Sequence, residues 1–172
     1  NYSWLELLSI YMFYLLLMVC YFFRDPIRSI SGGDSSFLSP ADGRIISIED
    51  YNDIHIGKST KIAIFLSVLN VHRQWTPLSG KVINTLYNPG KFFGAFKNKA
   101  SDKNEQTSIL FQDYKKNTFK IKQIAGFVAR RIVNHMNEDL KVNQGDKLGF
   151  IKFGSRVEII VPKNFDIKVK KG

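Results

Sequence analysis

The chain has few of the residues that build disulfides and metal sites. Its 172 residues include one cysteine, Cys20, which excludes a disulfide framework and a cysteine-based metal site. The three histidines, His55, His72 and His135, lie far apart and lack the spacing of metal ligands. The composition therefore argues against a metalloenzyme.

Charge is almost absent from the first 23 residues, where Glu6 is the only charged side chain. The remainder carries 25 basic residues and, without Glu6, 14 of the 15 acidic ones, a net charge of +11. A basic domain beside an apolar segment favours an anionic membrane surface as partner. Nucleic acid is the rival partner, but neither an RNA-binding aromatic signature nor a helix-turn-helix pattern is present, so none is expected.

The apolar run from Trp4 to Phe23 predicts a membrane helix, because about 20 apolar residues span the hydrocarbon core. Three aromatic residues at 21–23 resemble an interfacial belt. Arg24 and Arg28 follow, and the positive-inside tendency places the next domain on the cytoplasmic face of the cell membrane. No small-residue cleavage site follows, which disfavours a signal peptide. An interfacial or re-entrant helix stays open.

The rest of the chain predicts a mostly β (α+β) domain of lipoyl or barrel-sandwich type. We expect a membrane-anchoring helix over residues 1–24, a Gly/Ser-rich linker over 25–36 and the folded domain over 37–172. The stretches 39–46 and 76–83 share one pattern, in which Pro, two residues, Gly and a cation precede β-branched residues. That pattern predicts a turn that starts a strand.

Other segments predict further strands. The apolar run 61–69 suits a buried strand, and 109–124 suits a hairpin around residues 115–117. The stretch 126–135 fits either a strand or a short helix. The basic stretch 90–103 predicts a long functional loop or a short helix.

The pair Gly154–Ser155 lies between two apolar, β-branched runs, where glycine is disfavoured. One interpretation is a bulge or a tight hairpin. The other is a peptide bond made to break, since a serine hydroxyl can attack the preceding carbonyl and glycine tolerates strained backbone there. Elimination at the serine would then leave a pyruvoyl group, an electrophilic cofactor built from the chain itself.

Two more polar residues stand where strands meet turns. Asp42 fits an Asx turn, which alone is its simplest role. His72 follows an apolar run and precedes a proline turn. It fits either the capping of backbone groups or proton transfer near neutral pH.

These segments occur in the order found in the phosphatidylserine decarboxylases, and the chain resembles the short, membrane-anchored branch of that family. The matching segments include Phe22-Phe-Arg-Asp-Pro26, Ser39-Pro-Ala-Asp-Gly43, Asn70-Val-His-Arg73, Asn88-Pro-Gly-Lys-Phe92, Asn104-Glu105, the run 123–131 and Phe150-Ile-Lys-Phe-Gly-Ser-Arg-Val157. The resemblance implies self-cleavage between Gly154 and Ser155. A β chain then ends at Gly154, and an α chain begins with a pyruvoyl group derived from Ser155. This covalent group is the electron sink, so neither pyridoxal phosphate nor a metal is expected.

The resemblance also implies conversion of phosphatidylserine to phosphatidylethanolamine and CO₂ in phospholipid biosynthesis. Asp42 matches an acid implicated in self-cleavage, and His72 matches a histidine that handles the carboxylate or protonates the carbanion. Trp75 stands where the better-known long branch has a second histidine, and indole cannot accept a proton. The base that activates Ser155 is therefore open between His72, Asp42 and backbone strain.

Lys91, Phe92, Phe93 and Phe96 form a candidate surface for docking on the membrane and its serine phospholipid. Phenylalanine can act as an apolar wedge and lysine can meet lipid phosphate; alternatively the phenylalanines only cover the barrel. A homo-oligomer stays open. So do two other functions: decarboxylation of archaetidylserine or another serine phospholipid, and a non-enzymatic, membrane-anchored lipoyl-like adaptor.

Overall fold

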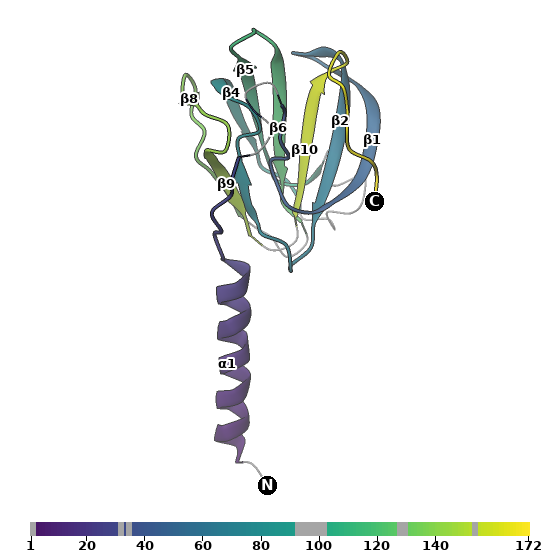
Figure 1. Cartoon of the computed structure of the whole chain (residues 1–172). Coiled ribbons are helices and arrows are strands. Elements are labelled where there is room, and N and C mark those ends of the chain that lie inside the picture. Colours follow the sequence, from purple (N-terminus) through teal and green to yellow (C-terminus); the bar gives the residue numbers. More distant parts are fainter. Residues whose placement is uncertain (1–2, 31–32, 34–35, 92–102, 127–130, 153–154) are drawn as a thin grey trace.

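The computed structural model shows one helix that projects from the end of a domain made of antiparallel strands (Figure 1). It describes residues 3–30, 33, 36–91, 103–126, 131–152 and 155–172. This architecture confirms the expected mostly β class with an N-terminal helix.

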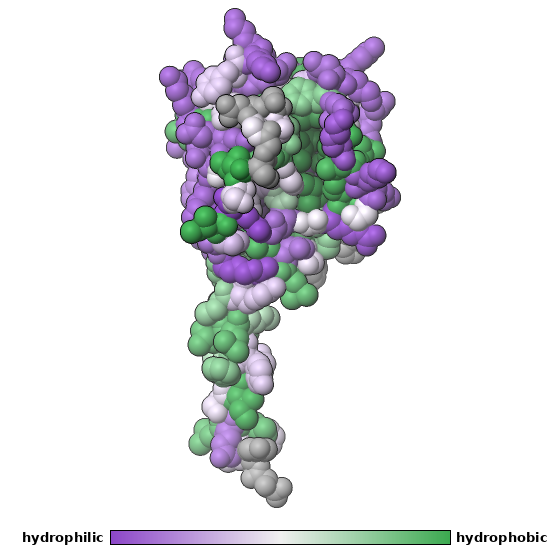
Figure 2. Space-filling view, viewed as in Figure 1, coloured by the Kyte–Doolittle hydropathy of each residue, from purple (hydrophilic) through white to green (hydrophobic). Residues whose placement is uncertain are grey.

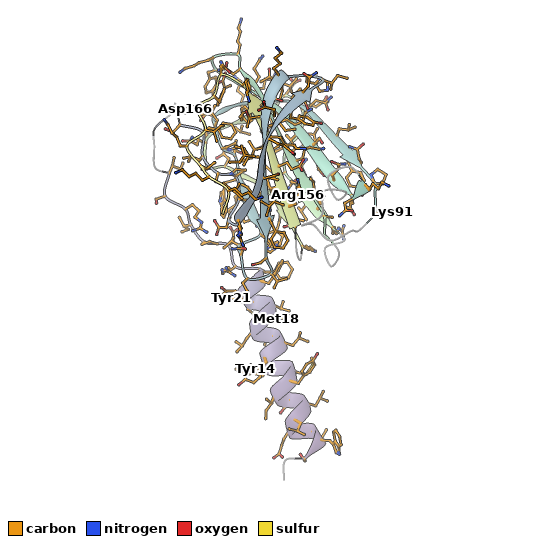
Figure 3. All side chains as sticks on the ribbon, turned by 90° about the vertical axis from the view of Figure 1, so that its right-hand side faces the viewer. Tyr14, Met18, Tyr21, Lys91, Arg156 and Asp166 are labelled. Atoms are coloured by element: carbon orange, nitrogen blue, oxygen red, sulfur yellow. The ribbon has the colours of Figure 1, made fainter. Side chains whose placement is uncertain are left out.

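Helix α1 covers Trp4–Phe22. Glu6 lies in its first turn and helps to cap it. The Ser3 amide donates to the Glu6 carboxylate at 2.7 Å, and the Glu6 amide donates to Ser3 Oγ at 3.3 Å. Its 19 residues extend about 28 Å, enough to cross the hydrocarbon core. The helix stands below the polar domain as an apolar column in Figure 2, and side chains such as Tyr14 and Met18 project outward in Figure 3.

The domain consists of two antiparallel sheets. The larger sheet has the order β1 (Arg44–Asp53), β2 (Gly57–Leu66), β10 (Ser155–Pro162), β6 (Thr118–Ile124), β5 (Gln106–Asp113), β4 (Gly80–Asn88) and β8 (Lys141–Val142). The smaller sheet has the order β3 (Arg73–Trp75), β9 (Lys147–Ile151) and β7 (Ile132–Asn134).

One apolar core lies between the two sheets. Val157 and Ile159 of β10 face it from the larger sheet, and Leu148 and Ile151 of β9 close it from the smaller one. Alternate residues of a strand point to the same face, so the odd-numbered residues of β10 all face this core.

Most of the strand predictions are confirmed. The two Pro-x-x-Gly turns lead into β1 and β4, the buried run becomes β2, and residues 115–117 join β5 to β6. The ambiguous stretch ends in the short strand β7. The central part of the expected loop, 92–102, and residues 127–130 lie outside the described residues.

The stacked rings of Phe111 and Phe119 are expected to contribute strongly to stability. Both side chains are fully buried, with ring centroids 5.0 Å apart and planes 7° from parallel. Phe111→Ala should lower the free energy of unfolding by about 3–5 kcal/mol, because it leaves a cavity in the core. Urea unfolding of the detergent-solubilised chain measures this. Tyr114→Ala, at an exposed ring beyond the end of β5, is the control and should change stability little.

Candidate functional site

Ser155 is the first residue of β10 and faces the core. It pairs with Leu66, the last residue of β2, and lies on the same face as Val157. The residue is completely buried, and Ser155 Oγ makes no hydrogen bond to any of the described residues. A buried polar atom without a partner costs about 1–3 kcal/mol, so such an atom calls for an explanation. Gly154 lies outside the described residues.

His72 lies at the same corner of the fold. The chain leaves β2 at Leu66, opposite Ser155, and passes through His72 into β3 of the smaller sheet. The His72 carbonyl accepts a hydrogen bond from the Ile151 amide at 3.3 Å, at the point where β9 ends and the chain returns toward Ser155. The ends of β2 and β9 and the start of β10 therefore lie together, at the end of the domain next to α1 (Figure 1).

The contacts of His72 determine which of its nitrogens is available for chemistry. Its Nδ1 lies 2.9 Å from the Asn70 carbonyl oxygen, which can only accept, so Nδ1 carries the proton. Nε2 is buried and has no hydrogen-bond partner within the part of the chain that the structure describes. Burial lowers the pKa of His72, the Asn70 contact raises it, and the nearby Arg24 charge lowers it further, for a net decrease. The imidazole is thus neutral near pH 7, with a free acceptor at Nε2.

Asp42 lies at the same end of β2, in the turn before β1. Gly43 packs so closely on Phe65 that an added Cβ would overlap the Phe65 carbonyl oxygen, which holds this turn against the strand. The Asp42 carboxylate forms an ion pair with Arg28 and is about one-third exposed. The Arg28 guanidinium also lies 5.4 Å from the centre of the Trp75 ring. Trp75, at the position of the missing histidine, therefore lies under the cation that binds Asp42.

Two buried glutamines support His72, and sequence reasoning missed both. Gln74 Nε2 donates to the His72 carbonyl, and Gln123 Nε2 donates to Gln74 Oε1 at 2.9 Å. Gly149 makes room for these two linked glutamines, because an added Cβ would overlap Gln123. A signal for Gln123 was present, because it follows Phe119 and Ile121 at the core-facing positions of β6.

The Asn104–Glu105 segment adjoins Ser155 through β6. Arg156 pairs with Ile124, which places Ala125 beside Ser155. The Ala125 amide donates to the Glu105 carbonyl at 2.9 Å, and Asn104 Nδ2 donates to the Ala125 carbonyl at 2.7 Å.

Of the candidate docking residues, the structure places only Lys91. Its backbone binds Glu105, with the Glu105 amide donating to the Lys91 carbonyl at 3.1 Å, and its side chain is exposed. Phe92, Phe93 and Phe96 lie outside the described residues.

Other polar features lie away from this corner. Arg156 and Glu158 form a buried ion pair of 2.7 Å on the face of β10 opposite Ser155; Figure 3 labels Arg156. Two cavities, of about 430 and 380 Å³, are lined by residues other than His72 and Ser155. Within the described ranges, no three acidic, histidine or cysteine side chains are grouped as a metal site requires.

The lowered pKa of His72 predicts a loss of stability in mild acid. As the pH falls from the ordinary histidine pKa of about 6.5 toward the lower pKa of folded His72, the unfolded chain binds a proton that the folded chain does not. The free energy of unfolding should therefore fall with decreasing pH, with a contribution from His72 of up to about 1.4 kcal/mol per pH unit. Urea titrations between pH 7 and pH 5 test this. His72→Gln should flatten the dependence, whereas His55→Gln, at an exposed site between β1 and β2, should keep it. Equal slopes for wild type and His72→Gln would contradict the prediction.

Comparisons with known proteins agree with this arrangement. A family model described as "Phosphatidylserine decarboxylase" matches residues 15–172. The chain is 46% identical over 160 residues to a "Phosphatidylserine decarboxylase proenzyme" of Ehrlichia ruminantium (strain Gardel), an alignment that covers 91% of this chain and 70% of that protein. A protein of the same name from Prosthecochloris aestuarii is 40% identical over 159 residues, covering 92% and 73%. These matches confirm a decarboxylase and set the adaptor interpretation aside: the chain belongs to the phosphatidylserine decarboxylase family.

Proposed function

We propose that the chain is a self-cleaving, pyruvoyl-dependent enzyme that converts phosphatidylserine to phosphatidylethanolamine and CO₂. The observation that carries the proposal is a pair of buried polar atoms at one corner of the fold, Ser155 Oγ and His72 Nε2, neither of which has a partner among the described residues. One is a hydroxyl that needs an acceptor, and the other is a nitrogen that needs a donor. The relatives' designation as proenzymes supports a processing step in which these atoms act.

The processing step uses only residues of the chain. Ser155 Oγ attacks the carbonyl carbon of Gly154, and the peptide bond is replaced by an ester as the serine nitrogen takes up a proton. Loss of the Ser155 Cα proton expels the Gly154 carboxylate and leaves dehydroalanine. One water molecule then enters and one ammonia leaves, which produces the pyruvoyl group at the new N-terminus. A buried hydroxyl that binds no other group is a suitable precursor.

We assign the base in this step to His72. Its neutral imidazole has Nδ1–H directed at the Asn70 carbonyl, so Nε2 can take the serine proton while Asn70 stabilises the resulting cation. Asp42 is a poorer base, because its carboxylate is already bound by Arg28. We assign Asp42 a positioning role, in which its ion pair holds the turn before β1 against the end of β2.

The same imidazole serves decarboxylation. The pyruvoyl group would condense with the substrate amine, with loss of water, and would then supply the electron sink for the pair left when CO₂ departs. His72 Nε2 takes a proton from the substrate ammonium group and later returns a proton to the carbon that lost CO₂. Because the surroundings of His72 are buried, water competes poorly for that carbon.

The remaining assignments concern the membrane. Residues 1–24 anchor the chain in the membrane, residues 25–36 form the linker and residues 37–172 form the catalytic domain. Arg24 and Arg28 favour placement of this domain on the cytoplasmic face. The site lies at the end of the domain next to α1, so a lipid headgroup can reach it while the acyl chains stay in the bilayer. Lys91 adjoins the same region through Glu105 and is proposed to contact lipid phosphate, with Phe92, Phe93 and Phe96 at the membrane surface.

Ser155→Ala should abolish processing and activity. Wild-type chain in membranes should separate into a fragment that ends at residue 154 and one that begins at 155 with a blocked N-terminus. The variant should stay as one chain and release no CO₂ from phosphatidylserine. Intact-mass spectrometry and trapping of labelled CO₂ measure both results. Ser47→Ala is a matched control, because Ser47 Oγ is also buried without a partner but lies on β1. A wild-type chain that stays whole and inactive would refute the proposed function.

His72→Gln should slow self-cleavage at least about 100-fold, since general base catalysis typically contributes that much. His72→Gly should regain part of the rate when imidazole is added, which a merely structural role would not produce. Asp42→Asn should slow cleavage less than His72→Gln. The time course of fragment formation measures all three variants. If His72→Gln were processed at the wild-type rate, the base would have to be another group.

A further inference from the structure

The last turn of the membrane helix lies directly against His72. Phe22 is the one buried residue of α1, with 2% of its surface exposed. Its ring centroid lies 4.4 Å from that of the imidazole, with the two planes 38° apart. Phe150 of β9 packs edge-on against Phe22 at 5.9 Å, and Phe23 stacks on Phe150 at 5.4 Å. The membrane anchor thus contributes part of the wall around the proposed base.

Polar contacts on both sides of His72 hold this turn in place. Arg24 Nη2 donates to the Leu69 carbonyl at 2.7 Å, in the segment that precedes His72. Asp25 pairs with Arg73, the next residue after His72, at 3.2 Å and with Lys147 of β9 at 2.6 Å. These contacts lower the pKa of Asp25, so its charge persists throughout the neutral range. The neighbouring residues Arg24 and Asp25 therefore fix the position of the Phe22 ring relative to the imidazole.

The position of Phe22 controls what can reach the imidazole. Phe22 covers one side of the ring, and Asn70 occupies Nδ1, which leaves Nε2 as the functional nitrogen. Among the described residues, the charged groups placed beside His72 by their contacts are Arg24 and Asp25 after α1, Arg73 on β3 and Lys147 on β9. One further titratable group, His135 after β7, lies 3.4 Å from the Arg73 guanidinium. Three of these four are cations and the one acid is bound to two of them, so no free carboxylate among them favours a charged imidazole.

We propose that Phe22 is a positioning residue for His72, and that the docked end of the membrane helix is required for the site to be complete. Phe22 excludes water from the imidazole and holds its ring plane, so that Nε2 faces the site. Catalysis is thereby tied to an anchor that stands where the lipid substrate enters. The inference rests on the proposed role of His72 in the reaction.

A packing role alone would give a different result from a positioning role. If Phe22 only filled space, its removal would lower stability without changing the protonation of His72 in the molecules that remain folded. If it shields the imidazole, its removal admits water and raises the pKa of His72 toward the ordinary value of about 6.5. As the pH is lowered, the rate of CO₂ release would then begin to fall at a higher pH than in the wild type.

Phe22→Ala in the full chain, reconstituted in phosphatidylserine vesicles, tests the proposal. The pKa of His72 is read from the NMR shifts of ¹³C-labelled imidazole, with His72→Gln to assign the signal, and CO₂ release is followed against pH. We expect Phe22→Ala to move both the pKa and the acid limb of the rate profile upward together. Phe22→Leu, which stays apolar but loses the ring, should give an intermediate shift. Phe13→Ala is the matched control, because Phe13 lies on the same helix with 58% of its surface exposed.

A second variant keeps the test decisive if Phe22→Ala fails to fold. Phe23→Ala removes a ring that packs edge-on against Phe22 and stacks on Phe150, without altering any charge, and it should shift the His72 pKa in the same direction. Tyr14→Ala, at an exposed ring of α1 (Figure 3), is its control. An unchanged His72 pKa in folded Phe22→Ala or Phe23→Ala chain would overturn the proposal. Because the pKa is measured without turnover, that result differs from failure of the proposed function, in which His72→Gln would retain full cleavage and CO₂ release.

Discussion

The pairing of β10 with β2 is the interaction on which the site depends. It places Ser155 opposite Leu66, where β2 ends and the chain turns toward His72. The same strand end receives the Asp42 turn through Gly43. A shift of one residue in this register would turn Ser155 away from the core and bring Arg156 into it. The apolar residues that alternate along β10 therefore hold the Ser155 hydroxyl, the proposed nucleophile, on the core-facing side.

The corner formed in this way combines an apolar shell with a few polar groups. His72 and Ser155 are buried with one polar atom each left without a partner, whereas Gln74 and Gln123 are linked to the His72 backbone. Hydrogen-bonded groups give rigidity, and the two atoms without a partner among the described residues are the ones proposed to react. A low local polarity also keeps the imidazole neutral, which suits a base that works near pH 7.

Much of this could be predicted from the sequence, because the relevant signals are local. Apolar, β-branched runs identified β2 and the strand that begins at Ser155, the stretch 109–124 identified the β5–β6 hairpin, and the Pro-x-x-Gly turns identified the starts of β1 and β4. Gln123 shows what a local sequence pattern does not predict, namely the partner of a buried polar side chain. Its polar character at a core-facing position was visible, but its partner Gln74 belongs to the other sheet, and the spacing of 49 residues between them carries no signal.

The sequence by itself determined the apolar N-terminal helix, most of the strands and the types of reactive group available at Ser155, His72 and Asp42, because each follows from residue type and near neighbours. Only the tertiary structure decided that the ends of β2 and β9 meet the start of β10 at one corner, that Arg28 binds Asp42 beside Trp75, and that Phe22 covers His72. Those contacts join residues far apart in the chain. They form because the two sheets pack around one core and because the last turn of α1 packs against one end of the domain.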